Sequence, residues 1–194
     1  MAEKTRLSRT DWTAAALEAL AEGGVAAVAI ERLAIRLGTT KGSAYWHFAT
    51  RDALLRAALA RWESDHTDAV IAVAEAGQGA RAKLRALFDA VIVHGAGSAI
   101  ERAVLGAAGD PLVAPVVRRV YQRRLGYLTR LYRGMGFGPA AARRRALAAY
   151  SVYLGLIQLN ATMPEAVPRT RKARRAYVDD LLGALSAPPD DRVE

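Results

Sequence analysis

The sequence predicts an all-α fold. Apolar residues recur at helical spacing, for example Leu84, Leu87, Phe88 and Val91 at i, i+3, i+4 and i+7. Signals that start and stop helices separate these stretches. No run of residues has the composition needed to build a parallel sheet. We therefore expect about nine helices.

Capping residues mark where several of these helices begin. Ser8 with Asp11 three residues later resembles a capping box, which predicts a helix over 12–22. Thr50 can cap a long helix over 51–75. The other predicted helices cover 30–37, 40–48, a segment around 84–92, a segment from Asp110-Pro111 to Arg133, 139–159, and a segment that carries Tyr177 to Leu185.

The segment 30–51 is predicted to form a helix, a tight turn and a short helix. Gly38 can take the left-handed conformation that ends a helix. Thr40 can then cap the next helix with its hydroxyl. Two helices joined by a short turn that contains glycine make a helix-turn-helix unit.

The second helix of this unit has side chains suited to DNA. Lys41 is in its first turn, where the helix dipole already favours an anion, so a phosphate or a base edge is a fitting partner. Phe48 is the natural core residue, which leaves Tyr45, Trp46 and His47 as donors to a DNA backbone. The alternative is that this aromatic run is partly buried packing.

The residues GTTKGSAYWHFATRDALL, from Gly38 to Leu55, resemble the recognition-helix signature of the TetR family of bacterial transcriptional regulators. The resemblance extends over about residues 7–59. It implies phosphate contacts from Tyr45, His47 and Arg51. It also implies that Thr39, Thr40, Lys41 and Ser43 face the major groove or its rim. Trp46 is a further candidate DNA contact, through its indole N–H.

Two positions depart from the family pattern. Ala29 stands where Ser or Thr usually precedes the first helix of the unit, which removes a capping hydroxyl worth about 1 kcal/mol. Ala44 stands where a larger apolar residue is usual. These departures affect the details of docking rather than the pattern itself.

The resemblance also predicts the domain organisation. It implies a helix-turn-helix DNA-binding head over 1–55, with the motif at about 29–48, and a ligand-binding and dimerisation domain over 56–186. Residues 187–194 are predicted to be a flexible tail. We expect a small-molecule effector among the helices between 84 and 159, and no cofactor. The candidate polar ligand contacts are His94, Glu101, Tyr121 and Tyr127.

Two apolar stripes predict a homodimer. They contain Leu147, Tyr150, Leu154 and Ile157 in one helix, and Leu181, Leu182 and Leu185 in the last. A two-fold dimer would present its recognition helices about one DNA turn, ~34 Å, apart on a palindromic operator.

Net charge does not support DNA binding by the head. The chain carries a net charge of +9, but residues 1–66 hold nine Lys or Arg and eight Asp or Glu, a net of +1. The excess lies in the rest of the chain, where solvated helix faces explain most of it. The absence of cysteine excludes disulfides and thiolate chemistry, and no secretory signal is visible. We expect a cytoplasmic protein.

Two segments have features of other classes of protein. Residues 146–164 carry no charge and follow three arginines, as in a membrane protein, but Ser151, Gln158 and Asn160 interrupt them, which favours a buried helix. Residues 91–97 resemble the dinucleotide loop of a cofactor enzyme, but Ile100 stands at the third glycine position. The three histidines are far apart and lack metal-ligand spacing. We therefore expect neither an enzyme nor a membrane partner.

Overall fold

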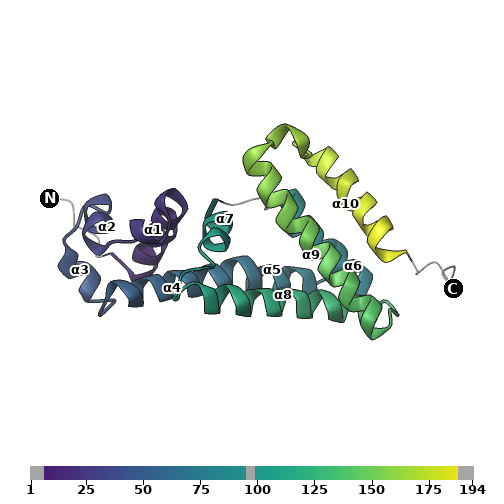
Figure 1. Cartoon of the computed structure of the whole chain (residues 1–194), viewed down its shortest axis with the longest axis horizontal. Coiled ribbons are helices and arrows are strands. Elements are labelled where there is room, and N and C mark those ends of the chain that lie inside the picture. Colours follow the sequence, from purple (N-terminus) through teal and green to yellow (C-terminus); the bar gives the residue numbers. More distant parts are fainter. Residues whose placement is uncertain (1–6, 95–98, 188–194) are drawn as a thin grey trace. The chain divides into compact units, whose positions relative to one another are not determined.

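The computed structural model describes residues 7–94 and 99–187, and all regular structure within these ranges is helical (Figure 1). If α4, the π-helical turn after it and α5 are counted as one helix, the described chain has nine helices. The predicted all-α fold is confirmed. The chain forms two compact units: residues 1–66 with 99–120, and residues 67–98 with 121–194.

The first unit is built on α1 (Arg9–Gly23), which packs against α4 and α7. Ser8 Oγ accepts from Asp11 N–H at 3.2 Å, and the Asp11 carboxylate accepts from Ser8 N–H at 2.7 Å. This is the predicted capping box. The bonds from the Ser8 backbone and hydroxyl hold the pKa of Asp11 below its ordinary value. α1 buries Trp12 and Leu20 completely.

The helix-turn-helix consists of α2 (Ile30–Arg36) and α3 (Lys41–Tyr45), after a 3-10 turn, η1 (Val25–Ala27). Gly38 has a φ of 62°, as predicted for the residue that ends the first helix. Two details of the prediction were wrong. α3 ends at Tyr45, because the backbone turns at Trp46 and His47, and Thr40 holds the capping position without a side-chain hydrogen bond.

The long helix after Thr50 is interrupted by a wider turn. α4 (Arg51–Glu63) leads into a π-helical segment, η2 (Ser64–Asp68), and α5 (Ala69–Glu75) follows directly. Thr50 Oγ1 caps α4 by accepting from Ala53 N–H at 3.1 Å, as predicted. The first compact unit ends inside η2, at residue 66, and also includes α7 (Ala99–Gly106). The compact unit that contains the head is therefore larger than the predicted DNA-binding domain, residues 1–55. That these 55 residues form the functional domain stays a prediction.

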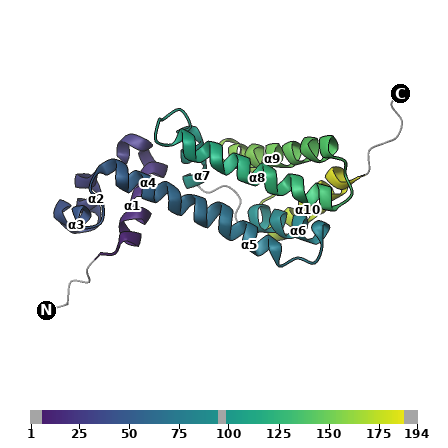
Figure 2. The same cartoon turned by 90° about the horizontal axis from the view of Figure 1, so that it is seen from below.

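The second unit contains α6 (Ala80–Phe88), a π-helical segment η3 (Asp89–His94), α9 (Pro139–Thr162), η4 (Pro164–Ala166) and α10 (Arg171–Ser186). Figure 2 shows these helices from a second side. The core of this unit includes Leu84, Phe88, Val178 and Leu182 from these helices, together with Tyr132 from the segment 121–134. Residues 188–194, most of the predicted tail, lie outside the described residues.

α8 (Ala114–Gly134) begins later than predicted. Asp110 does not open the helix, because its side chain and carbonyl close a tight turn instead. Asp110 Oδ1 accepts from Leu112 N–H at 2.8 Å, and the Asp110 carbonyl accepts from Ala114 N–H at 2.9 Å.

Two findings concern the segments that suggested the alternative classes. Residues 91–94 are helical, so they do not supply the strand that a dinucleotide loop requires, and Gly95 and Gly97 lie outside the described residues. None of the described helices combines the length and hydrophobicity needed to span a bilayer.

Candidate nucleic-acid interface

α3 is fixed to the head by its apolar side and turns the opposite side outward. Ala44 is completely buried and Phe48 is 2% exposed. By contrast, Tyr45 is 50% exposed and Trp46 is 78% exposed, and Thr40 and Lys41 are exposed as well. Because Ala44 is small and completely buried, α3 can lie close to the rest of the head at this position.

A shallow hollow of about 570 Å³ lies along this outward side of α3 and is lined by Thr40, Gly42, Ser43 and Trp46. The structure therefore brings three of the predicted DNA contacts together around one concave surface. Thr39 is half-buried at the end of the turn, where its N–H donates to the Ala34 carbonyl at 2.9 Å.

His47 connects the end of α3 to the start of α1. Its ring Nε2 lies 3.0 Å from the Leu7 carbonyl, which can only accept, so Nε2 carries the proton of this bond. Arg9 Nη1 donates to the His47 carbonyl at 2.8 Å, and the Arg9 guanidinium lies 4.4 Å from the centre of the Phe48 ring. Arg9 was not foreseen, because it is 38 residues from its partner.

Arg51 also makes contacts inside the head. Its Nε donates to the Val28 carbonyl at 2.9 Å, and its Nη2 donates to the Val25 carbonyl at 2.5 Å. A third bond joins Nη1 to Asp52 at 3.3 Å. The guanidinium thus holds the turn that leads into α2, at the place where Ala29 provides no capping side chain. Its role as a phosphate contact stays a prediction.

The predicted ligand residues do not share one compact unit. Glu101, in the first unit, is 1% exposed and accepts from Trp62 Nε1 at 2.8 Å. The other three lie in the second unit, where His94 is exposed, Tyr121 is half-buried and Tyr127 is buried. Burial, with the nearby Glu75 carboxylate, raises the pKa of Tyr127.

A group of aromatic and basic side chains in the second unit was only partly foreseen. Arg124 Nε donates to Thr67 Oγ1 at 3.0 Å, and Arg124 Nη1 lies 3.4 Å from the Tyr150 hydroxyl. The Tyr150 ring lies 5.5 Å from Tyr121 edge-on and stacks with Tyr153 at 6.0 Å. Thr67 and Arg124 carry no local sequence signal, because their contacts span 57 residues.

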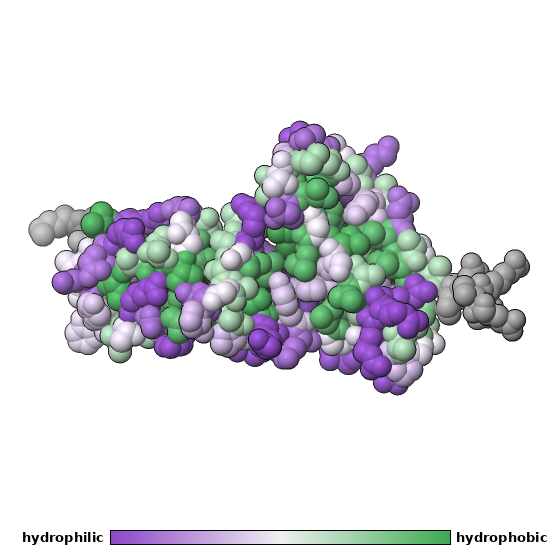
Figure 3. Space-filling model, in the orientation of Figure 1, coloured by the Kyte–Doolittle hydropathy of each residue, from purple (hydrophilic) through white to green (hydrophobic). Residues whose placement is uncertain are grey.

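The predicted dimer residues differ in exposure. Leu147 is 59% exposed, whereas Tyr150, Ile157 and Leu182 are buried within the chain itself. The remaining three, Leu154, Leu181 and Leu185, are half-buried. Apolar residues of this region appear over α9 and α10 on the face drawn in Figure 3.

A helix-turn-helix that exposes polar and aromatic groups defines a class of DNA-binding protein. Residues 13–58 match the family described as bacterial regulatory proteins, tetR family. Residues 13–58 therefore form the N-terminal domain typical of TetR-family regulators, as the signature at Gly38 to Leu55 predicted.

Solved structures extend the similarity to the fold of the whole chain. A transcriptional regulator from Rhodococcus sp. Rha1 is 22% identical, with 92% of this chain and 96% of that chain covered and a TM-score of 0.72. A TetR-family regulator from Streptomyces coelicolor is 23% identical, with 92% and 90% covered and a TM-score of 0.69. A putative transcriptional regulator from Saccharomonospora viridis in complex with choline is 20% identical, with 90% and 95% covered and a TM-score of 0.73. No curated protein matches the sequence.

Proposed function

We propose that this protein is a dimeric repressor that binds a palindromic operator through α3 and leaves it when a small molecule binds. The observation that carries this proposal is the outward side of α3. Lys41 and Tyr45 are exposed there, as is Trp46 directly after the helix, while Ala44 and the following Phe48 fix this segment to the head.

The chemistry of that side fits DNA. Lys41 is the first residue of α3, so its ammonium and the helix N-terminus both favour a phosphate. The Tyr45 hydroxyl and the Trp46 indole N–H are further donors for backbone oxygens. Thr40 and Ser43 line the hollow beside them and are short enough to reach base edges. Phosphate contacts set the register, and these two hydroxyls contribute to sequence choice.

In this proposal, His47 and Arg51 position the recognition helix. The Nε2 of His47 and the guanidinium of Arg51 are bonded to backbone carbonyls of the head, so they order the segments on either side of α2 and α3. A rigid support reduces the ordering cost when DNA binds.

The outward side of α9 supports the dimer. From residue 147 to the end of α9, the exposed residues are uncharged: they are Leu147, Ala148, Ser151, Gln158, Leu159, Ala161 and Thr162. Small and apolar residues without charge are what an interface between two identical helices needs. A stable dimer interface buries on the order of 1,600 Å² in total. Leu147 is the most exposed large apolar residue of this proposed surface, since Tyr150 and Ile157 are already buried.

The effector is proposed to be a small apolar or amphipathic molecule that binds among the central helices. One relative of the same fold holds choline, which supports a small-molecule role for this chain. In the second unit, Tyr121, Tyr150 and Tyr153 with Arg124 provide aromatic surface beside a few polar groups, as in many ligand sites. An effector that prefers one head spacing shifts the population toward it and releases DNA.

Selection from random DNA, followed by a binding assay with the selected site, tests the proposal. We expect a near-palindromic sequence, and we expect the double variant Lys41→Ala, Tyr45→Ala to lose most of its affinity. Arg56→Ala is the matched control, because Arg56 is an exposed cation on α4 outside α3. Sedimentation at micromolar concentration should give a dimer, and a monomer would refute that part. A promoter–reporter assay distinguishes repression from activation.

A further inference from the structure

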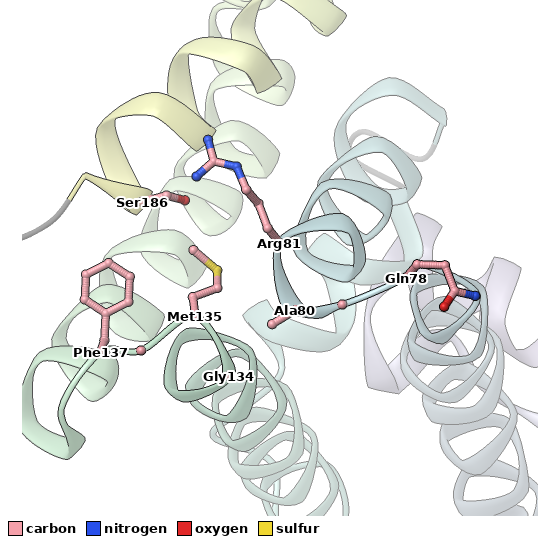
Figure 4. Close-up of a pocket in the computed structure, with 9 residues that line it drawn as sticks. Gln78, Ala80, Arg81, Gly134, Met135, Phe137 and Ser186 are labelled. Carbon is pink, nitrogen blue, oxygen red and sulfur yellow. The ribbon is translucent and has the colours of Figure 1, made fainter.

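A cleft of about 570 Å³ lies in the second unit, among the start of α6, the turn between α8 and α9, and the end of α10. This volume is within the range of small-molecule sites, ~300–1,000 Å³. Figure 4 shows its main side chains. Arg81 extends from α6 toward the Ser186 hydroxyl, and Met135 and Phe137 belong to the turn after α8.

Three features of the cleft favour an anion. Arg81 is in the first turn of α6, and no carboxylate within residues 7–94 and 99–187 pairs with it. The other cations of this helix are already neutralised, since Lys83 pairs with Glu75 and Arg85 with Asp179. A lone cation at the positive end of a helix is mildly destabilising, unless an anion binds beside it.

The second feature is the uncapped start of α6. Gly79 holds the capping position and has no side chain to accept from the first backbone N–H groups of the helix. α6 and η3 together run from residue 80 to residue 94. Oriented N–H groups at such a helix start are donors for a carboxylate or phosphate oxygen.

The third feature is Ser186. Its Oγ is buried and, among the described residues, has no hydrogen-bond partner, although Ser186 lines the cleft. A buried hydroxyl without a partner is costly, so a ligand oxygen that accepts from it would be favoured.

The opposite side of the cleft is apolar and held in place. The Phe137 ring lies 4.4 Å from the Arg145 guanidinium and 5.9 Å from the Tyr132 ring. Arg145 also donates to the Leu185 carbonyl at 3.1 Å, which fixes the end of α10 beside this wall. Met135 adds a soft apolar surface that adapts to the shape of a ligand.

We propose that this cleft binds a small carboxylate with an apolar body. The carboxylate lies between Arg81, the first N–H groups of α6 and the Ser186 hydroxyl, and the apolar body packs on Met135 and Phe137. The site is separate from the tyrosine group with Arg124, and it does not depend on the proposed DNA binding.

Calorimetric titration of the full chain with 3-phenylpropanoate tests the proposal, with the neutral 3-phenylpropanamide as the matched ligand. The carboxylate should bind at least about tenfold more tightly than the amide, because the amide lacks the charge that Arg81 recognises. Arg81→Gln should weaken carboxylate binding about tenfold or more, and Ser186→Ala about two- to tenfold. Arg143→Gln, at an exposed arginine of α9 outside the cleft, should leave it unchanged.

Several results would overturn the site. These are no binding at millimolar carboxylate, equal affinity for acid and amide, or equal loss in the Arg81 and Arg143 variants. Arg81 is exposed, so its variant should fold normally, which thermal unfolding checks. Because the titration contains no DNA, a negative result leaves the proposed operator binding untouched, and failure of operator binding leaves this site untouched.

Discussion

Replacing Arg51 by alanine separates two roles that this side chain can have. In the structure, its guanidinium holds the carbonyls of Val25 and Val28 and also bonds to Asp52. A hydrogen bond to a charged group contributes about 1.5–3 kcal/mol when it is well shielded. The side chain is 36% exposed, so we discount its bonds for solvent screening and expect a total loss of roughly 1–3 kcal/mol.

Two measurements distinguish these roles. Thermal unfolding of Arg51→Ala should show Tm lowered by roughly 3–10 °C. The dependence of operator affinity on salt should keep its slope, because a positioning residue neutralises no phosphate. A direct phosphate contact would instead reduce the slope by about 0.9. Arg56→Ala is the control for a lost cation in the same helix. An unchanged Tm together with a smaller slope would refute the positioning role.

Three further predictions concern stability. Thr50→Ala should lower the free energy of unfolding by about 1 kcal/mol in urea titrations, since it removes the bond to the first turn of α4. Thr40→Ala should change stability little, because its hydroxyl caps no helix. The same variant should weaken operator binding, because Thr40 is a proposed DNA contact. Equal losses in both variants would contradict this. Gly38→Ala should cost about 1–2 kcal/mol, because φ is 62° there, although space for the methyl group is open; a neutral effect would contradict the turn. Burial raises the pKa of Tyr132 from 10.0 to about 12. The stability that the neutral Tyr132 hydroxyl contributes should therefore be fully present below pH 10 and be lost as the pH rises toward 12. Tyr132→Phe should remove this part of the pH dependence. The same loss in the variant would contradict it.

Local signals in the sequence predicted much of the head. Ser8 with Asp11, Gly38 and Thr50 act on backbone groups within a few residues, so their spacing alone specifies the structure. The recognition helix was also found locally. Its length was overestimated, because the residues between Tyr45 and Phe48 include no glycine or proline that would indicate the turn that ends α3.

Contacts over long sequence distances could not be predicted. The sequence indicated Arg51 and His47 as functional side chains, but their long-range partners in the head are backbone carbonyls, which have no distinctive residue type. The π-helical turn after α4 was missed for a related reason. Thr67 in that turn meets Arg124 across 57 residues, and neither residue indicates the other.

Helical periodicity also failed to sort the sides of α9. Apolar residues occupy more than one side of this helix, so spacing grouped Leu147 with Tyr150 and Ile157. In the structure, Tyr150 packs in the core of its own unit, Ile157 is buried and Leu147 faces outward. Which side of α9 faces inward depends on where α8 and α10 pack, and the sequence of α9 alone does not indicate this.

The central claim is that the outward side of α3 binds operator DNA. The most direct test is fluorescence anisotropy with a DNA site selected by the wild-type protein, comparing the Lys41→Ala, Tyr45→Ala variant with Arg56→Ala at one salt concentration. All three proteins should show the same helical content by circular dichroism. We predict that the double variant loses at least about tenfold in affinity, while Arg56→Ala changes little. Unchanged affinity in the double variant would contradict the claim.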